Sequence, residues 1–94
     1  MNKYRYFVTY SYTEGLRPLC GSCMVDMNCE IKSNHDLNTV YKKLVKRDEL
    51  VTALEDTLHC SEEETASYDW CERKEFLDLT ITSFKLIKVI QRRK

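Results

Sequence analysis

Residues 4–12 read YRYFVTYSY, and this run decides the fold of the chain. Large side chains alternate in it, and β-branched and aromatic residues of this kind are enriched in strands. The alternation puts five of them on one face, namely Tyr4, Tyr6, Val8, Tyr10 and Tyr12. We therefore predict a first strand that buries one face of a sheet.

A second strand is predicted after a turn over residues 13–18. Gly15 permits a positive φ there, and Pro18 fixes φ and lacks a backbone donor. Residues 22–32 then alternate again, and their apolar side consists of Cys23, Val25, Met27, Cys29 and Ile31. One apolar and one mostly polar face is typical of a sheet covered on one side. The two strands should form an antiparallel hairpin.

The middle of the chain is predicted to be helical. Ser33 can cap a helix with Asp36 as its capping-box partner. Helical spacing then relates Leu37, Val40, Tyr41, Leu44 and Val45. A second apolar stripe over residues 50–58 either continues this helix or begins a new one near Asp48. Ser61 and Glu64 repeat the cap pattern and predict a helix over residues 62–72.

Alternation returns from residue 76 and slips near Ser83 and Phe84, as at a β-bulge or a tight turn. Leu86, Ile87, Val89 and Ile90 then complete a last strand. A basic, solvated tail over residues 91–94 follows. The predicted order is β-β-α(α)-β, an α+β fold with helices packed on one face of a small antiparallel sheet. With 94 residues, the chain should form a single domain over residues 1–94.

The formal net charge is zero, but the charges are unevenly distributed. Residues 1–47 carry eight Lys/Arg and four Asp/Glu, residues 48–76 carry two and ten, and residues 77–94 carry five and one. An acidic segment thus lies between two basic ends. The distribution of charge, more than its total, steers the approach of partners.

Composition narrows the class of protein. We expect a compact, cytoplasmic protein, because the chain shows neither a signal-peptide core nor an apolar stretch long enough to span a membrane. Its five cysteines should be reduced thiols, because an odd number cannot pair completely within one chain. No pattern meets the requirements of a catalytic site, so we do not expect an enzyme.

Zinc is the one metal that the sequence suggests as a cofactor. Cys20 and Cys23 have the C-x-x-C spacing at which two thiolates can bind one zinc ion. A structural site needs four ligands, and His59, Cys60 and Cys71 could supply the rest. The alternative is that these cysteines act as small hydrophobic residues, and we favour it because a second C-x-x-C is absent.

The tyrosine-rich strand is similar to sheets that stack nucleobases. Such sheets also need many cations to hold phosphates, and the first two strands offer few. We therefore expect no direct nucleic-acid binding and interpret this face as half-buried against a helix or a second copy.

The acidic segment is the strongest candidate for a partner-binding surface. Its carboxylates are too dispersed for a calcium loop, but they are dense enough to form acidic helix faces. The residues are Asp48, Glu49, Glu55, Asp56, Glu62, Glu63, Glu64 and Asp69. The alternative interpretation is an ordinary solvated surface.

Short stretches at the two ends resemble small uncharacterised proteins of bacteriophages and prophages. They are Tyr6–Tyr10, Gly21-Ser22, Ile31–Ser33 before Asp36-Leu37, and Ile81–Phe84. Residues 47–75 look like a helical acidic insertion relative to these proteins. The resemblance implies a non-catalytic accessory protein that binds and inhibits or modulates a host or defence protein.

We expect this protein to self-associate through an exposed sheet edge or face. A second hypothesis is that a small anionic, nucleotide-like ligand is held between protomers. The cations available for it are Arg5, Arg17, Lys42 and Lys43. A third hypothesis is a zinc-stabilised binding module.

Overall fold

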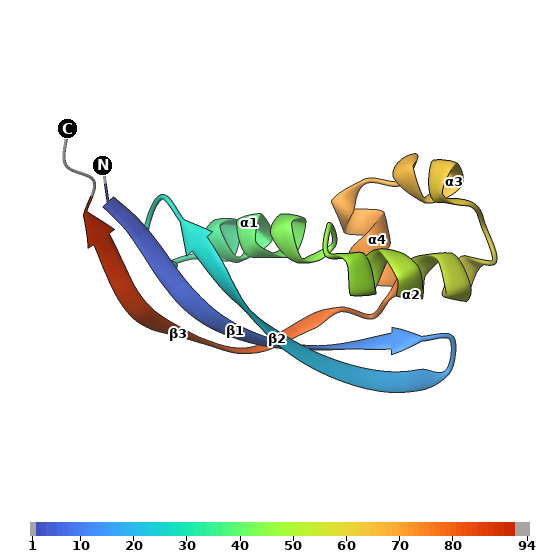
Figure 1. Cartoon of the computed structure of the whole chain (residues 1–94), viewed down its shortest axis with the longest axis horizontal. Coiled ribbons are helices and arrows are strands. Elements are labelled where there is room, and N and C mark those ends of the chain that lie inside the picture. The colour runs from blue at the N-terminus through green and yellow to red at the C-terminus, as the bar shows by residue number, and fades with distance from the viewer. Residues whose placement is uncertain (1, 92–94) are drawn as a thin grey trace.

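The protein is an α+β fold in which a three-stranded antiparallel sheet carries helices on one side (Figure 1). The computed structural model describes residues 2–91. In chain order the elements are β1 (Asn2–Glu14), β2 (Arg17–Met27), α1 (Asn34–Leu44), α2 (Asp48–Leu58), α3 (Glu62–Ala66), α4 (Trp70–Phe76) and β3 (Thr80–Gln91). The α+β class and the order of strands and helices predicted from the sequence are confirmed.

β1 is the central strand, and the sheet order is β2-β1-β3. It pairs with β2 through a tight turn at Gly15, which has a φ of 64° and therefore a conformation that glycine adopts readily. The register sets Val8 opposite Cys23 on one side and Phe84 on the other. All three strands are long and strongly curved, as Figure 1 shows.

The core lies between the sheet and the helices. The predicted inward face of β1 is confirmed, because Tyr6, Val8, Tyr10 and Tyr12 are buried and Tyr4 packs partly against them. The helices contribute Val40, Leu44, Val45, Leu50, Ala53 and Leu54 to the same core. Tyr6 is also anchored by its hydroxyl oxygen, which accepts a hydrogen bond of 2.9 Å from the backbone N–H of Ile31.

The two apolar stripes predicted over residues 37–45 and 50–58 belong to separate helices. The sequence had left open whether they form one helix or two. The Ser33 side chain caps α1 by accepting a hydrogen bond from the backbone N–H of Asp36. α1 ends at Leu44, and the extended backbone of Arg47 then begins α2. Asp48 and Glu49 lie in the first turn of α2, where a helix dipole favours negative charge.

The helix predicted over residues 62–72 is instead two short helices. Ser61 caps α3 as predicted. α3 ends at Ala66, and Asp69 then caps α4 with a complete capping box to Glu72. In the two short helices Thr65 is buried, whereas Ala66 and Cys71 are exposed.

Two strand boundaries also differ from prediction. β2 covers residues 17–27 instead of 22–32, because the turn needs only two residues and an edge strand tolerates Pro18. β3 begins at Thr80 instead of residue 76, because Phe76 ends α4. The predicted bulge is found at Thr82, one residue before Ser83, and a second lies at Ile87. Residues 92–94 of the predicted tail lie outside the described residues.

Candidate protein-binding surface

Four large apolar side chains of β3 are exposed although β3 belongs to the sheet. Phe84, Leu86, Ile87 and Val89 are 40–49% exposed, and we call them the β3 apolar patch. Such contiguous exposed apolar groups on a small protein mark interaction surfaces more often than scattered ones do.

The patch is exposed because the helices cover β1 and β2 but not most of β3. Phe84 and Leu86 lie opposite Val8 and Tyr6 of β1, which are 0% and 4% exposed. α1 reaches β3 near its start, where the Tyr41 hydroxyl oxygen accepts a hydrogen bond of 3.0 Å from the N–H of Ile81. Beyond Ile81 the side chains of β3 on the helix side of the sheet, those of Phe84, Leu86 and Val89, are 40–42% exposed.

The other face of β3 is basic. Lys85 lies opposite Phe7 and Lys88 lies opposite Arg5, so both lysines are on the face of the sheet away from the helices. β3 therefore presents Phe84, Leu86 and Val89 on the helix side and both lysines on the other side, where Ile90 lies opposite Lys3; Ile87 is the extra residue of a bulge. Neither lysine forms an ion pair within residues 2–91.

β3 is also an edge strand. It is hydrogen-bonded to β1 on one side only, so the backbone N–H and C=O groups on its other side have no strand partner among the described residues. An edge of this kind can pair with a strand of another chain. A bulge at each of Thr82 and Ile87 leaves a regular stretch over Ser83–Leu86.

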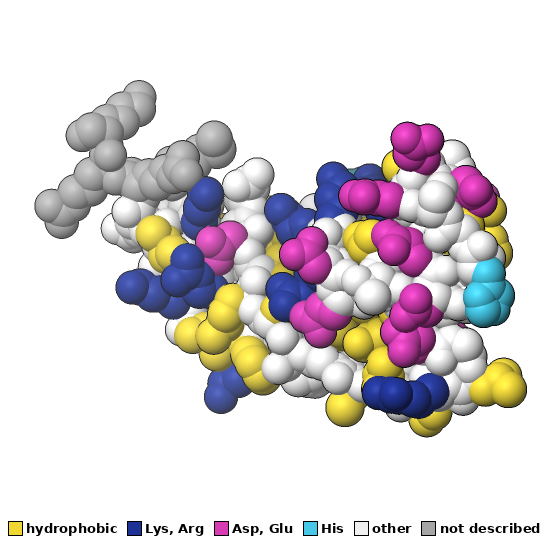
Figure 2. Space-filling view, turned by 45° about the vertical axis from the view of Figure 1, so that its right-hand side comes forward, with side chains coloured by type: hydrophobic (Ala, Val, Ile, Leu, Met, Phe, Trp, Pro, Cys, Tyr) yellow, Lys and Arg dark blue, Asp and Glu magenta, His cyan; other side chains and the backbone are white. Residues whose placement is uncertain are grey.

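The acidic residues predicted to bind a partner lie at the end of the molecule that is farther from the start of β1 and the end of β3. They belong to α2, to α3 and to the cap of α4, and all except the half-buried Glu55 are exposed. Figure 2 shows most of the visible acidic side chains on this half of the molecule, interspersed with basic and hydrophobic side chains. Arg47 neutralises part of it through an ion pair of 2.8 Å with Glu49.

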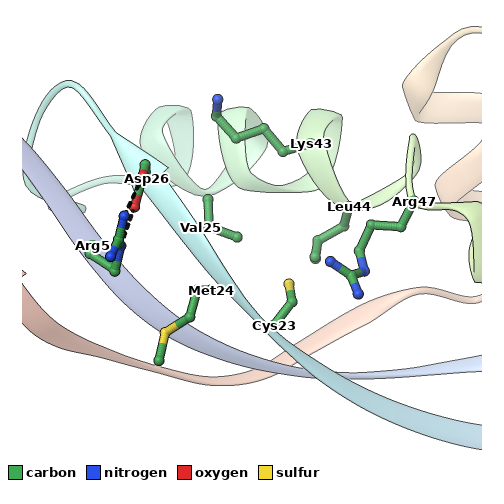
Figure 3. A pocket seen from close by; sticks show the side chains of 8 residues that line it. All are labelled: Arg5, Cys23, Met24, Val25, Asp26, Lys43, Leu44 and Arg47. Atoms are coloured by element: carbon green, nitrogen blue, oxygen red, sulfur yellow. Dashed lines mark hydrogen bonds and ion pairs between the residues drawn. The ribbon is translucent and has the colours of Figure 1, made fainter.

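The four cations predicted to hold an anionic ligand are not brought together. Arg5 and Lys43 line a cleft of about 410 Å³ beside β2 and the C-terminal end of α1. Arg5 is paired there with Asp26 at 2.8 Å (Figure 3), and its guanidinium lowers the pKa of that carboxyl. Lys42 lies instead over the ring of Trp70, and Arg17 is at the hairpin.

The structure separates the cysteines that could have bound zinc. Cys20 lies opposite Ser11 on the open face of the sheet, whereas Cys23 lies opposite Val8 on the covered face. Cys60 follows α2 and Cys71 is in α4. Within residues 2–91, no three His, Cys, Asp or Glu side chains are arranged so that they could hold a metal ion.

The thiols of Cys23 and Cys60 are not activated as nucleophiles. Burial raises the pKa of both Cys23 and Cys60. At Cys60 the negative charges of Glu64 and Glu55 raise the pKa further. A raised pKa reduces the fraction of reactive thiolate. Arg47 points toward Cys23 (Figure 3), but its charge does not overcome the effect of burial.

The β3 apolar patch is the surface that sequence reasoning did not resolve. The apolar residues of this last strand were visible in the sequence, but they also fit a strand whose apolar side is covered. Only the position of the helices shows that this side is open.

None of the helices in the described residues is long and apolar enough to cross a membrane.

The chain matches no protein-family model, no curated protein and no solved structure. Its surfaces are therefore interpreted from their own geometry and charge.

Proposed function

We propose that this protein is a non-enzymatic accessory protein of the phage type. It binds a host or defence factor in the host cytoplasm and inhibits or modulates it through protein–protein contacts. The β3 apolar patch carries the proposal, because four neighbouring large apolar side chains on one strand are exposed to 40–49%. Burying them against a partner removes apolar surface from water, the main driving force of protein association.

The sites available for chemistry support binding over catalysis. Burial raises the pKa of the Cys23 thiol. The guanidinium groups of Arg5 and Arg47 at the cleft are each paired with a carboxylate. Among the described residues, these groups do not form the nucleophile and base pair that covalent catalysis needs.

The acidic end adds a long-range electrostatic contribution. Carboxylates of α2 and α3 lie together at one end of a molecule 46 Å long. Such a charge distribution orients an approaching basic surface and raises the association rate. In this proposal the apolar patch supplies the affinity and the acidic end supplies orientation.

The test is capture of a partner from bacterial lysate by the immobilised protein, followed by mass spectrometry. Leu86→Lys places a charge in the patch and should abolish capture. Leu16→Lys is the matched control, because Leu16 is fully exposed at the hairpin and lies outside the patch. Circular dichroism establishes that both variants are folded.

The acidic contribution is tested separately. Reversing Glu62, Glu63 and Glu64 to Lys should slow capture and make it less sensitive to salt, because screening acts on exposed charges. Equal capture by wild type and the Leu86→Lys variant, or no specific capture by wild type, would refute the proposed function.

A further inference from the structure

We infer that the partner adds an extended segment to β3 as a fourth strand, and that this segment alternates apolar with acidic side chains. The inference rests on the proposed function and specifies the chemistry of the partner. Three features of β3 carry it: a backbone edge without a strand partner and lysines without an ion pair, both among residues 2–91, and two chemically different sides.

The edge supplies the backbone hydrogen bonds. Within the described part of the chain β3 pairs only with β1, and the regular stretch Ser83–Leu86 lies between two bulges. In β-strand addition, the peptide backbone pairs with such an edge and alternate side chains determine specificity. The stretch between Thr82 and Ile87 is the expected centre of the added strand.

The side chains of β3 define what the added strand must carry. A residue that pairs with Phe84 or Leu86 lies on the helix side, where it meets an apolar surface. A residue that pairs with Lys85 lies on the opposite face, next to an ammonium group without an ion pair within the described residues. Opposite charges in such cross-strand positions are stabilising, and like charges are destabilising.

The same charges argue against a second copy of this chain as the added strand. Antiparallel pairing of two β3 edges would bring Lys85 and Lys88 of both copies onto one face of the joined sheet. Lysines on an edge strand and bulges within it are devices that disfavour such self-pairing. A docked helix would meet the apolar side but leave the lysines and the backbone edge unused.

The experiment uses two fluorescently labelled synthetic peptides and the full chain. One peptide alternates glutamate with valine, and the other alternates lysine with valine. Fluorescence anisotropy measures binding, and hydrogen exchange reports which backbone amides become protected. The variant is Lys85→Glu/Lys88→Glu, with Lys32→Glu/Lys46→Glu as a control of equal charge change at exposed positions outside the sheet.

We expect the Glu-Val peptide to bind, to protect amides of β3, and to bind the Lys85→Glu/Lys88→Glu variant about tenfold more weakly. That variant should in turn prefer the Lys-Val peptide, whereas the control variant should keep the wild-type preference. Protection confined to other elements, or binding with no dependence on Lys85 and Lys88, would overturn the inference.

Two further outcomes separate this inference from the proposed function. If neither peptide binds but lysate capture is lost in Leu86→Lys, strand addition is wrong and the proposed function stands. If sedimentation shows a concentration-dependent species of twice the 11.2 kDa chain mass that Leu86→Lys abolishes, a second copy occupies β3 and the inference is wrong. Absence of any Leu86-dependent capture refutes the proposed function itself.

Discussion

The sharpest structural prediction concerns Gly21, which lies in β2 opposite Tyr10. A Cβ atom at this position would lie 2.7 Å from the Tyr10 hydroxyl oxygen, 2.8 Å from Cζ and 2.9 Å from Cε2. Tyr10 is 1% exposed and stacks near Tyr12, with ring centroids 6.0 Å apart. The ring therefore cannot move away without displacing other core side chains.

Two effects oppose each other in Gly21→Ala. Alanine in a strand interior is favoured over glycine by roughly 0.5–1 kcal/mol, because the unfolded chain loses less entropy. Overpacking a core costs about 1–3 kcal/mol. All three contacts of the new Cβ are shorter than 3.0 Å, so the clash outweighs the gain. We expect the free energy of unfolding to fall by about 1–2 kcal/mol.

Thermal and urea unfolding measure this change. For a domain of this size, the expected loss corresponds to a fall in Tm of roughly 5–15 °C. In a Tyr10→Leu background the clash is removed, so Gly21→Ala should then be neutral or stabilising. A rise in Tm on Gly21→Ala in the wild-type background would show that the ring of Tyr10 does not lie over Gly21.

Three other predictions follow from local geometry. Ser33→Ala removes the cap of α1 and should lower the free energy of unfolding by about 1 kcal/mol, which urea titration measures; an unchanged midpoint would contradict the capping role. The hydrogen bond from Arg5 lowers the pKa of Asp26 in the folded state. The resulting stability is present above the pKa of about 4 that Asp26 has in the unfolded chain, and it is lost as the pH falls through the lower pKa of the folded state. Asp26→Asn should therefore flatten the plot of unfolding free energy against pH in that acidic range. If both profiles fall equally below pH 4, the Arg5–Asp26 pair does not contribute. Iodoacetamide at mildly alkaline pH should alkylate the exposed Cys20 before Cys23, whose pKa is raised by burial, and peptide mass spectrometry that finds Cys23 modified first would refute this order.

The elements with a clear period were predictable. β1 and the core face of α1 follow patterns of two and of three to four residues, and those patterns depend only on backbone geometry. The caps at Ser33 and Ser61 were also predictable, because capping involves residues within one turn of each other.

Element ends were less predictable. The start of β3 at Thr80 depends on where α4 stops, and the separation of α3 from α4 depends on Asp69 as a second cap inside an apparently helical stretch. Local patterns allow either outcome, because short helices are stabilised mainly by what they pack against.

The candidate surface shows the same division more clearly. The sequence by itself determined that a strand rich in large apolar side chains follows the helical segment, and that the middle of the chain is acidic. Only the tertiary structure decided that the apolar side of β3 is open. The reason is that the exposure of a side chain depends on which layer lies over it. Leu86 and Tyr6 are paired across two strands, yet Leu86 is 40% exposed and Tyr6 is 4% exposed, because the helices lie over Tyr6 and not over Leu86.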